Sequence, residues 1–224
     1  MLLAGGWMAP ASAEPHIIRS QGDGRWSNPQ TWEGGEIPGK GARVQIRPGH
    51  VVEYDLSSDT PIRTIHVAGR LTFATDQDTR LDVGLIRIQA GETFVEEGFD
   101  CHMMHRADHG GHGEAALEIG TPEQPIPAEH TTTVRLVHFD GADPMSLPAI
   151  VACGGRLDIH GAPMRRTWVK LQQTAAVGET RLFLAEPVAD WRAGDRIIIT
   201  GTNRQRPFAG QSTDHVTDQP TTEE

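Results

Sequence analysis

The sequence of 224 residues is poor in cysteine and tyrosine and has no long apolar run. Two cysteines cannot form a disulfide-rich scaffold or a closed cysteine-based zinc site. No run approaches the roughly 20 apolar residues of a membrane-spanning helix, so we expect no integral membrane segment. The net charge of −10 argues against a nucleic-acid partner, because nucleic-acid binding depends on cations that neutralise phosphates. What is present, 37% hydrophobic and 22% charged residues, is an ordinary composition for one large or two small globular domains.

Charge is unevenly distributed along the chain. Residues 1–150 carry 11 basic and 21 acidic side chains, whereas residues 151–210 carry 9 basic and 5 acidic ones. All but one of these nine basic residues are arginines, whose planar guanidinium binds carboxylate or sulfate groups through two parallel hydrogen bonds. This part of the chain therefore indicates either recognition of anionic groups or a solvated surface of mixed charge.

The first 13 residues have features of an export signal. The segment of residues 1–8 is short and apolar, and residues 11–13 (Ala-Ser-Ala) form a small-residue pattern typical of a signal-peptide cleavage site. A positive amino-terminal region is lacking, so an upstream start or a flexible terminus is the alternative. We expect a secreted, extracellular or periplasmic protein whose mature part covers residues 14–224. In that oxidising setting Cys101 and Cys153 either pair with each other or stay single buried thiols.

Short alternating runs of apolar residues predict β-strands, and helical spacing is scarce. Glycines at positions 49, 69, 91 and 155 precede several of these runs, at offsets of 20, 22 and 64 residues. Such a period predicts a parallel β-helix, in which each coil buries its apolar side chains against the next. A β-sandwich with regular turns is the alternative. The expected strands are 44–46, 62–67, 85–88, 133–137, 156–160 and 196–200.

A series of ordered motifs spans residues 22–224. The motifs are Trp26-Ser27-Asn28-Pro29-Gln30-Thr31-Trp32, Gly34-Gly35 with Ile37-Pro38-Gly39, Gly69-Arg70-Leu71, Ile119-Gly120-Thr121-Pro122, Gly155 to Gly161, Thr167-Trp168, and Asp190-Trp191 with Gly194-Asp195. In this order they resemble the G-eight (eight-glycine) domain. That domain occurs in cell-surface and secreted proteins, including the cell-migration-inducing hyaluronan-binding type, the transmembrane hyaluronidase type and fibrocystin.

The resemblance implies an all-β fold: a right-handed parallel β-helix with an N-terminal cap and a small β-rich insertion near the C-terminus. It also implies an extracellular location and a link to hyaluronan or another glycan. Because relatives continue into many more coils, we expect the chain to be part of a longer β-helix or of a larger surface protein.

A histidine-rich stretch is the sharpest local chemical signal. Imidazole and carboxylate groups suit zinc or copper, and interleaved glycines allow several of them to converge. The stretch therefore predicts a divalent-metal site, and the alternative is a solvated loop whose histidines only titrate near neutral pH. The candidate ligands are His102, His105, Asp108, His109 and His112, directly after Cys101.

The run of residues 155–161 supplies candidate ligand-binding and catalytic residues. Alternation predicts that its apolar side chains, Leu157 and Ile159, point inward and its polar side chains point outward together. An arginine, a carboxylate and a histidine in one row suit binding of a uronic acid and proton transfer beside it. The alternative is a surface row in which the arginine and the aspartate only pair with each other. The polar residues of this row are Arg156, Asp158 and His160.

Four further residues extend the candidate site. Arg165 and Arg166 are expected to bind anionic groups, and Trp168 is expected to stack on a sugar ring. Asp195 either caps backbone amides in a tight turn or, about 5–10 Å from Asp158, completes a carboxylate pair for glycoside hydrolysis. The leading hypothesis is a domain that binds an anionic extracellular polysaccharide and, as an enzyme, depolymerises it as a hydrolase or lyase. A non-catalytic adhesion module and an exported metal-binding protein are the alternatives.

Overall fold

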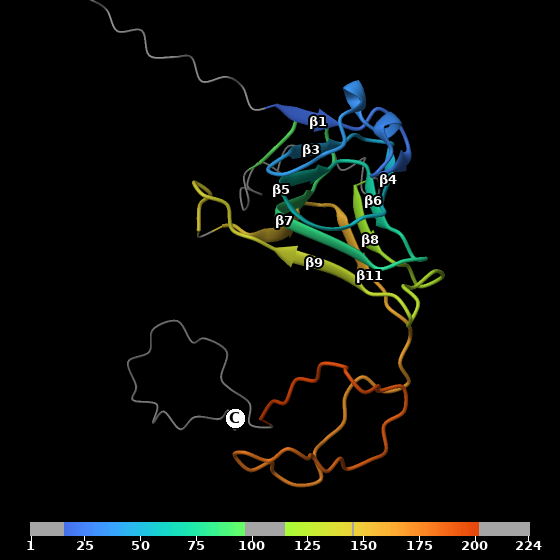
Figure 1. Cartoon of the computed structure of the whole chain (residues 1–224), viewed down its shortest axis with the longest axis vertical. Coiled ribbons are helices and arrows are strands. Elements are labelled where there is room, and N and C mark those ends of the chain that lie inside the picture. The colour runs from blue at the N-terminus through green and yellow to red at the C-terminus, as the bar shows by residue number, and fades with distance from the viewer. Residues whose placement is uncertain (1–15, 97–114, 145, 202–224) are drawn as a thin grey trace, which may run out of the picture. The chain divides into compact units, whose positions relative to one another are not determined.

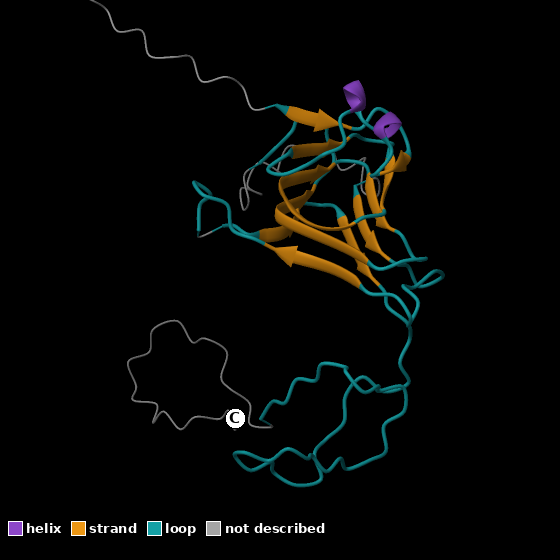
Figure 2. Ribbon diagram, in the orientation of Figure 1, coloured by secondary structure: helices purple, strands orange, loops and turns teal. Residues whose placement is uncertain are grey.

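The computed structural model describes residues 16–96, 115–144 and 146–201. The chain divides into two compact units, Met1–Ala162 and Pro163–Glu224. The first unit is built from short strands and two 3-10 turns, η1 (Pro29–Thr31) and η2 (Glu33–Gly35) (Figures 1 and 2). Its strands are β1 (Ile17–Arg19), β2 (Gly24–Arg25), β3 (Arg43–Ile46), β4 (Val51–Tyr54), β5 (Ser57–Val67), β6 (Arg70–Phe73), β7 (Thr79–Ile88), β8 (Ala116–Ile119), β9 (Thr132–Leu136), β10 (Ala149–Ala152) and β11 (Arg156–Ile159).

Two parallel sheets form the first unit, and the chain passes from one to the other between successive strands up to β9. One sheet has the order β1-β3-β5-β7-β10, with β9 also paired to β7, and the other has the order β11-β8-β6-β4-β2. Figure 1 shows β1, β3, β5 and β7 stacked in one layer and β4, β6 and β8 in another. The fold is therefore all-β, as predicted. The alternative of an antiparallel sandwich is wrong, because the ladders between the described strands are parallel.

Strand register aligns apolar positions that lie about one predicted period apart in the sequence. Val44 pairs with Ile65 and Ile65 with Ile86, and in the other sheet Val52 pairs with Leu71. All five side chains are fully buried. Burial of a large aliphatic side chain stabilises a fold by about 1.5–3 kcal/mol, so these columns of stacked side chains are the main source of stability.

Two of the glycines that precede strands act in different ways. Gly49 has a φ of 79°, a left-handed conformation that favours glycine, in the turn before β4. Gly69 packs so closely on the preceding turn that a Cβ atom there would collide with the carbonyl oxygens of Arg47 and His50. One glycine therefore permits a turn, and the other permits close stacking of successive strand layers.

An aromatic cluster lies beside η1 and η2, where we predicted an N-terminal cap. Trp26 and Trp32 are 1% and 0% exposed, and their ring centroids lie 4.9 Å apart. The Trp32 Nε1–H donates to the carbonyl oxygen of Trp26 at 2.8 Å, and Tyr54 packs edge-on against Trp26. Both tryptophans are therefore packing residues, and the indole N–H of Trp32 has a hydrogen-bond partner.

One predicted strand is wrong. Residues 196–200 form no strand, and the described part of the second unit holds a single isolated antiparallel bridge, between Leu171 and Leu184. The small β-rich insertion expected near the C-terminus is therefore not found among the residues described. A strand requires a neighbour for its backbone hydrogen bonds. The two residues predicted to point inward, Ile197 and Ile199, are 52% and 50% exposed, so no layer of the described chain covers them as it would in a core strand.

Candidate functional site

The outer face of the sheet formed by β2, β4, β6, β8 and β11 carries a row of polar side chains. Alternation along β8 places Leu117 in the core and Glu118 on the opposite face. Register then aligns Glu53 of β4 with Thr72 of β6, Thr72 with Glu118, and Glu118 with Asp158 of β11. Neighbouring strands are about 4.8 Å apart, so residues far apart in sequence form one closely spaced row.

Two arginines flank this row. Arg70 of β6 and Arg156 of β11 both align with Ala116 of β8. Arg156 forms ion pairs with Glu118 on the neighbouring strand and with Asp158 on its own strand. The Nε atom of Arg70 lies 3.6 Å from Glu118 Oε1. Glu118 therefore lies between two guanidinium groups, and its side chain is only 10% exposed.

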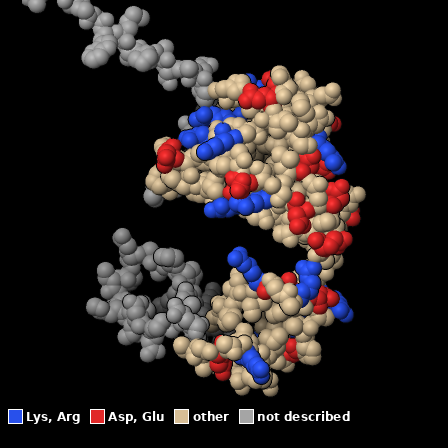
Figure 3. All heavy atoms as spheres, viewed as in Figure 1, with Lys and Arg blue, Asp and Glu red and all other residues tan. Residues whose placement is uncertain are grey.

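The two guanidinium groups are accessible, and one has an unused donor. The Arg70 and Arg156 side chains are 42% and 45% exposed. The Nε atom of Arg70 is buried and makes no hydrogen bond to any atom of the described chain, which is rare because buried polar atoms normally have partners. Basic and acidic side chains are also intermingled over the visible surface of this unit (Figure 3).

The sequence predicted part of this cluster. Arg156 and Asp158 lie together as expected, whereas Glu118 was missed. The signal for Glu118 was present, because the runs Leu-Glu-Ile-Gly and Leu-Asp-Ile-His-Gly match when β8 is aligned with β11. His160 follows the end of β11 and is half-buried, and its backbone N–H donates to the carbonyl oxygen of Ile119 at 2.8 Å.

The inward positions of β11 are aligned as predicted but not covered. Leu157 pairs with Leu117 and Ile159 with Ile119, which places them on the core side of the sheet. They are nevertheless 41% and 61% exposed. The reason is that β11 ends the strand order of its sheet among the described residues, so no further layer packs on these side chains.

The remaining predicted ligand-binding residues lie in the second unit. Arg165 donates from Nε and Nη2 to Asp190 at 3.1 Å each, and these hydrogen bonds lower the pKa of Asp190. Arg166 pairs with Glu186 at 2.7 Å. Trp168 is 69% exposed. Both arginines thus have carboxylate partners, while the indole ring is open to solvent.

Asp195 has the turn-capping contact that we predicted as one of its two roles. Its carboxylate accepts a hydrogen bond from the backbone N–H of Arg192 at 2.7 Å. Asp158 belongs to the first unit and Asp195 to the second, so a catalytic carboxylate pair of these two residues stays a prediction.

The predicted metal ligands His102, His105, Asp108, His109 and His112 lie outside the described residues. Within the ranges 16–96, 115–144 and 146–201, no group of three or more His, Cys, Asp or Glu side chains is placed to hold a metal ion. The predicted export signal, residues 1–13, is outside these ranges as well. Cys153 is 3% exposed and disulfide-bonded. The other cysteine of the sequence, Cys101, is not among the described residues.

A serine–histidine pair near the N-terminus is structural. The Ser20 Oγ atom lies 2.8 Å from His50 Nδ1 and accepts a hydrogen bond from the backbone N–H of Arg47. Ser20 is fully buried, so a substrate cannot reach its hydroxyl. The pair fixes the turn before β4 and is not a nucleophile with its base.

The fold and the charged row define an all-β protein of stacked parallel strands. No helix in the described chain is long and apolar enough to cross a membrane. The family model of the G8 domain matches residues 31–172, and the chain belongs to the G8 domain family. The motifs identified this family correctly.

Similar proteins are much longer than this chain. Fibrocystin of Mus musculus is 26% identical over 217 residues, which cover 87% of this chain and 4% of fibrocystin. Fibrocystin-L of Homo sapiens is 29% identical over 181 residues, which cover 80% of this chain and 4% of that protein. A G8 domain-containing protein of Dictyostelium discoideum is 24% identical over 183 residues, covering 78% of this chain and 11% of its own length. No solved structure matches the chain.

Proposed function

We propose that the chain is an exported parallel β-helix module that binds an anionic extracellular polysaccharide through the outer face of β4, β6, β8 and β11. The β-helix accounts for the alternation of successive strands between two parallel sheets and for the in-register columns. A right-handed coil follows from the general rule that parallel strands of one sheet are joined by right-handed crossovers.

The observation that carries this proposal is the half-exposed Arg156 between two carboxylates. Its guanidinium has a planar set of donors that matches a uronic carboxylate, and the carboxylate of Asp158, whose side chain is 24% exposed, can accept hydrogen bonds from sugar hydroxyls. Arg70, whose side chain is 42% exposed and whose Nε lies 3.6 Å from Glu118, places a second guanidinium in the same cluster. These groups form one cluster on a sheet, which is rigid enough to orient a sugar.

Binding fits this cluster better than glycoside hydrolysis. A general acid has to deliver a proton, whereas Glu118 and Asp158 each pair with a guanidinium, which suits the carboxylate form. Hydrolase or lyase chemistry by Asp158, His160 and Asp195 therefore remains the secondary version of the proposal. The histidine-rich segment remains a predicted zinc or copper site outside the described residues.

A second candidate function is a non-catalytic structural module of a longer surface protein. Each predicted anion-binding arginine, Arg156, Arg165 and Arg166, already has a carboxylate partner. The relatives are also far longer than this chain. An extracellular or periplasmic location is proposed for both functions, because a disulfide at Cys153 persists in oxidising compartments.

Binding of hyaluronan, a polymer that carries one uronic carboxylate per repeat, tests the proposal. We expect Arg156→Ala to lower the affinity at least about tenfold, the cost of losing charge-assisted hydrogen bonds. Arg135→Ala is the matched control, since Arg135 is an exposed arginine of β9 in the other sheet that pairs with Asp82 at 3.4 Å, and its affinity should match that of the wild type. Equal affinity of wild type and Arg156→Ala would exclude this face. Reducing-end release by the wild type would favour the enzyme version.

A further inference from the structure

A second polar row lies on the outer face of the other sheet and is buried. Register aligns Arg19 of β1 with Gln45 of β3, Gln45 with His66 of β5, and His66 with Arg87 of β7. Gln45, His66 and Arg87 are only 1%, 1% and 2% exposed. Polar side chains of this size are rarely so buried on an outer face, so something must cover them.

Residues 89–96, which we call the strap, form hydrogen bonds with this row. Gln45 donates from Nε2 to the carbonyl oxygen of Glu92 at 2.8 Å, and Arg87 donates from Nε to Gln89 Oε1 at 2.6 Å. His66 contacts the strap twice, because its Nε2 lies 3.0 Å from the carbonyl oxygen of Gln89 and its Nδ1 lies 3.3 Å from the backbone nitrogen of Val95. The strap is thus attached through side chains to β3, β5 and β7, which are neighbours in the sheet.

The two contacts of His66 fix its protonation state. The Val95 N–H can only donate, so Nδ1 must be the unprotonated, accepting nitrogen. The Gln89 carbonyl can only accept, so Nε2 must carry the proton. His66 is therefore a neutral imidazole. A second proton on Nδ1 would point at the Val95 N–H, donor against donor, and would place a buried cation beside Arg87 on the neighbouring strand.

We propose that His66 is a proton-sensitive latch, and that its protonation below neutral pH releases the strap from the outer face of β3, β5 and β7. This is independent of the glycan-binding proposal, because it concerns the other sheet. The strap leads in sequence toward the histidine-rich segment.

Taken together, the groups around His66 do not stabilise its protonated form, so protonation should break its contacts with the strap. Burial lowers the pKa of His66 most, the hydrogen bond to the Gln89 carbonyl raises it in part, and Arg87 lowers it further. The strap itself carries two acids. Glu92 is exposed and contributes its carbonyl to Gln45. Glu96, the other strap acid, is held by arginines of β3 and β5.

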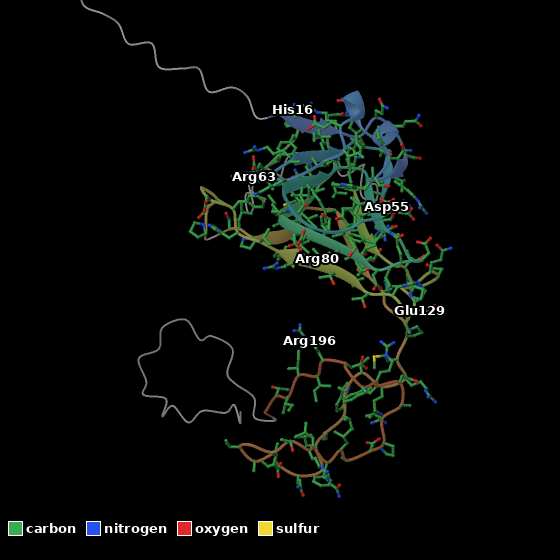
Figure 4. All side chains as sticks on the ribbon, viewed as in Figure 1. His16, Asp55, Arg63, Arg80, Glu129 and Arg196 are labelled. Atoms are coloured by element: carbon green, nitrogen blue, oxygen red, sulfur yellow. The ribbon has the colours of Figure 1, made fainter. Side chains whose placement is uncertain are left out.

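Glu96 anchors the end of the strap through a separate set of contacts. It accepts hydrogen bonds from Arg43 Nε at 2.6 Å and Arg63 Nε at 2.7 Å (Arg63 is labelled in Figure 4), and from Thr64 Oγ1 at 3.2 Å. Burial raises the pKa of Glu96, but the two arginines lower it more, so its pKa lies below the usual range of a glutamate and the carboxylate keeps its charge in mildly acidic solution. On acidification, the contacts of His66 with the strap should therefore be lost before the contacts that Glu96 makes with Arg43 and Arg63.

Amide hydrogen exchange followed by NMR tests the latch on the full chain. Between about pH 7.5 and about pH 5, we expect the protection factor of the Val95 amide, corrected for intrinsic exchange, to fall about tenfold or more as its acceptor is lost. The amide of Ile65, inside β5, should keep its protection. His66→Gln, which cannot be protonated, should abolish the pH response of Val95. Unchanged Val95 protection in the wild type, or the same fall in His66→Gln, would overturn the proposal.

The ring nitrogens of His66 give a second readout that needs no variant. Their 15N shifts at about pH 7.5 should identify the neutral form protonated at Nε2. A ring that is charged at this pH, or protonated at Nδ1, would also overturn the proposal, even if His66→Gln fails to fold.

Discussion

Glu118 shows how the positions of two arginines on the outer face of β6, β8 and β11 depend on one side chain. It is nearly buried, contacts Arg156 from the next strand and lies 3.6 Å from Arg70 of the preceding one. Removing one member of a buried charge network leaves the others without compensation, which costs more than the network gains when intact. The geometry of both accessible guanidinium groups is therefore set by a carboxylate that solvent barely reaches.

Glu118→Gln should lower the free energy of unfolding by about 1–3 kcal/mol, because Arg70 and Arg156 lose their shared negative partner while the side-chain volume is kept. Glu53→Gln is the matched control. Glu53 pairs with Arg25 on the same face but is 37% exposed, so its loss should be below about 1 kcal/mol. Urea unfolding of the three proteins measures both values. Equal losses would mean that the Glu118 network contributes no more than an exposed pair.

At the scale of elements, each strand depends on the strands stacked before and after it. The long strands β5 and β7 make the most extensive pairing, from Ser57 with Arg80 to Val67 with Ile88. Short strands such as β6 are held between neighbours on both sides. Close stacking at the turns then requires a residue without a side chain, which is the role of Gly69.

Gly69→Ala should destabilise the first unit by about 1–3 kcal/mol, because the added methyl group collides with backbone carbonyl oxygens that cannot move independently of the strands. Gly39→Ala is the matched control, since a Cβ at Gly39 meets no atom within 4 Å, and a change within about 0.5 kcal/mol is expected. Thermal and urea unfolding report the difference. A tolerated Gly69→Ala would contradict the close approach of these turns.

At the scale of the whole molecule, the two sheets of the first unit carry different outer faces. One has accessible arginines and carboxylates in pairs, and the other has a buried polar row under the strap. Figure 4 places Asp55 and Arg63 on opposite sides of this unit. Net charge alone, −10 for the chain, conceals this division, because the glycan-binding face proposed here pairs its arginines and acids locally.

The core and part of the site could be predicted from the sequence. Alternation and the glycine period identified the strands that contain Ile65 and Ile86, because a column of buried side chains repeats once per coil. The same alternation placed Arg156 and Asp158 on one face. These predictions depend only on the spacing of neighbouring residues, which is visible in the sequence without any knowledge of contacts between distant residues.

Features that depend on distant contacts could not be predicted in this way. Glu118 becomes part of the site only because β8 pairs with a strand about 40 residues further on. His66 looks like an ordinary outward residue until the strap, which has no periodicity, covers it. Residues 196–200 have a strand-like pattern but no neighbour in the described chain to pair with.

NMR titration of the 15N-labelled protein with a short uronic-acid oligosaccharide tests the glycan-binding face most directly. We expect saturable shift changes at the amides of Glu118, Asp158 and their neighbours on β6, β8 and β11, with a single dissociation constant. Changes confined to β1, β3 and β5, or no change at saturating sugar, would contradict the proposal.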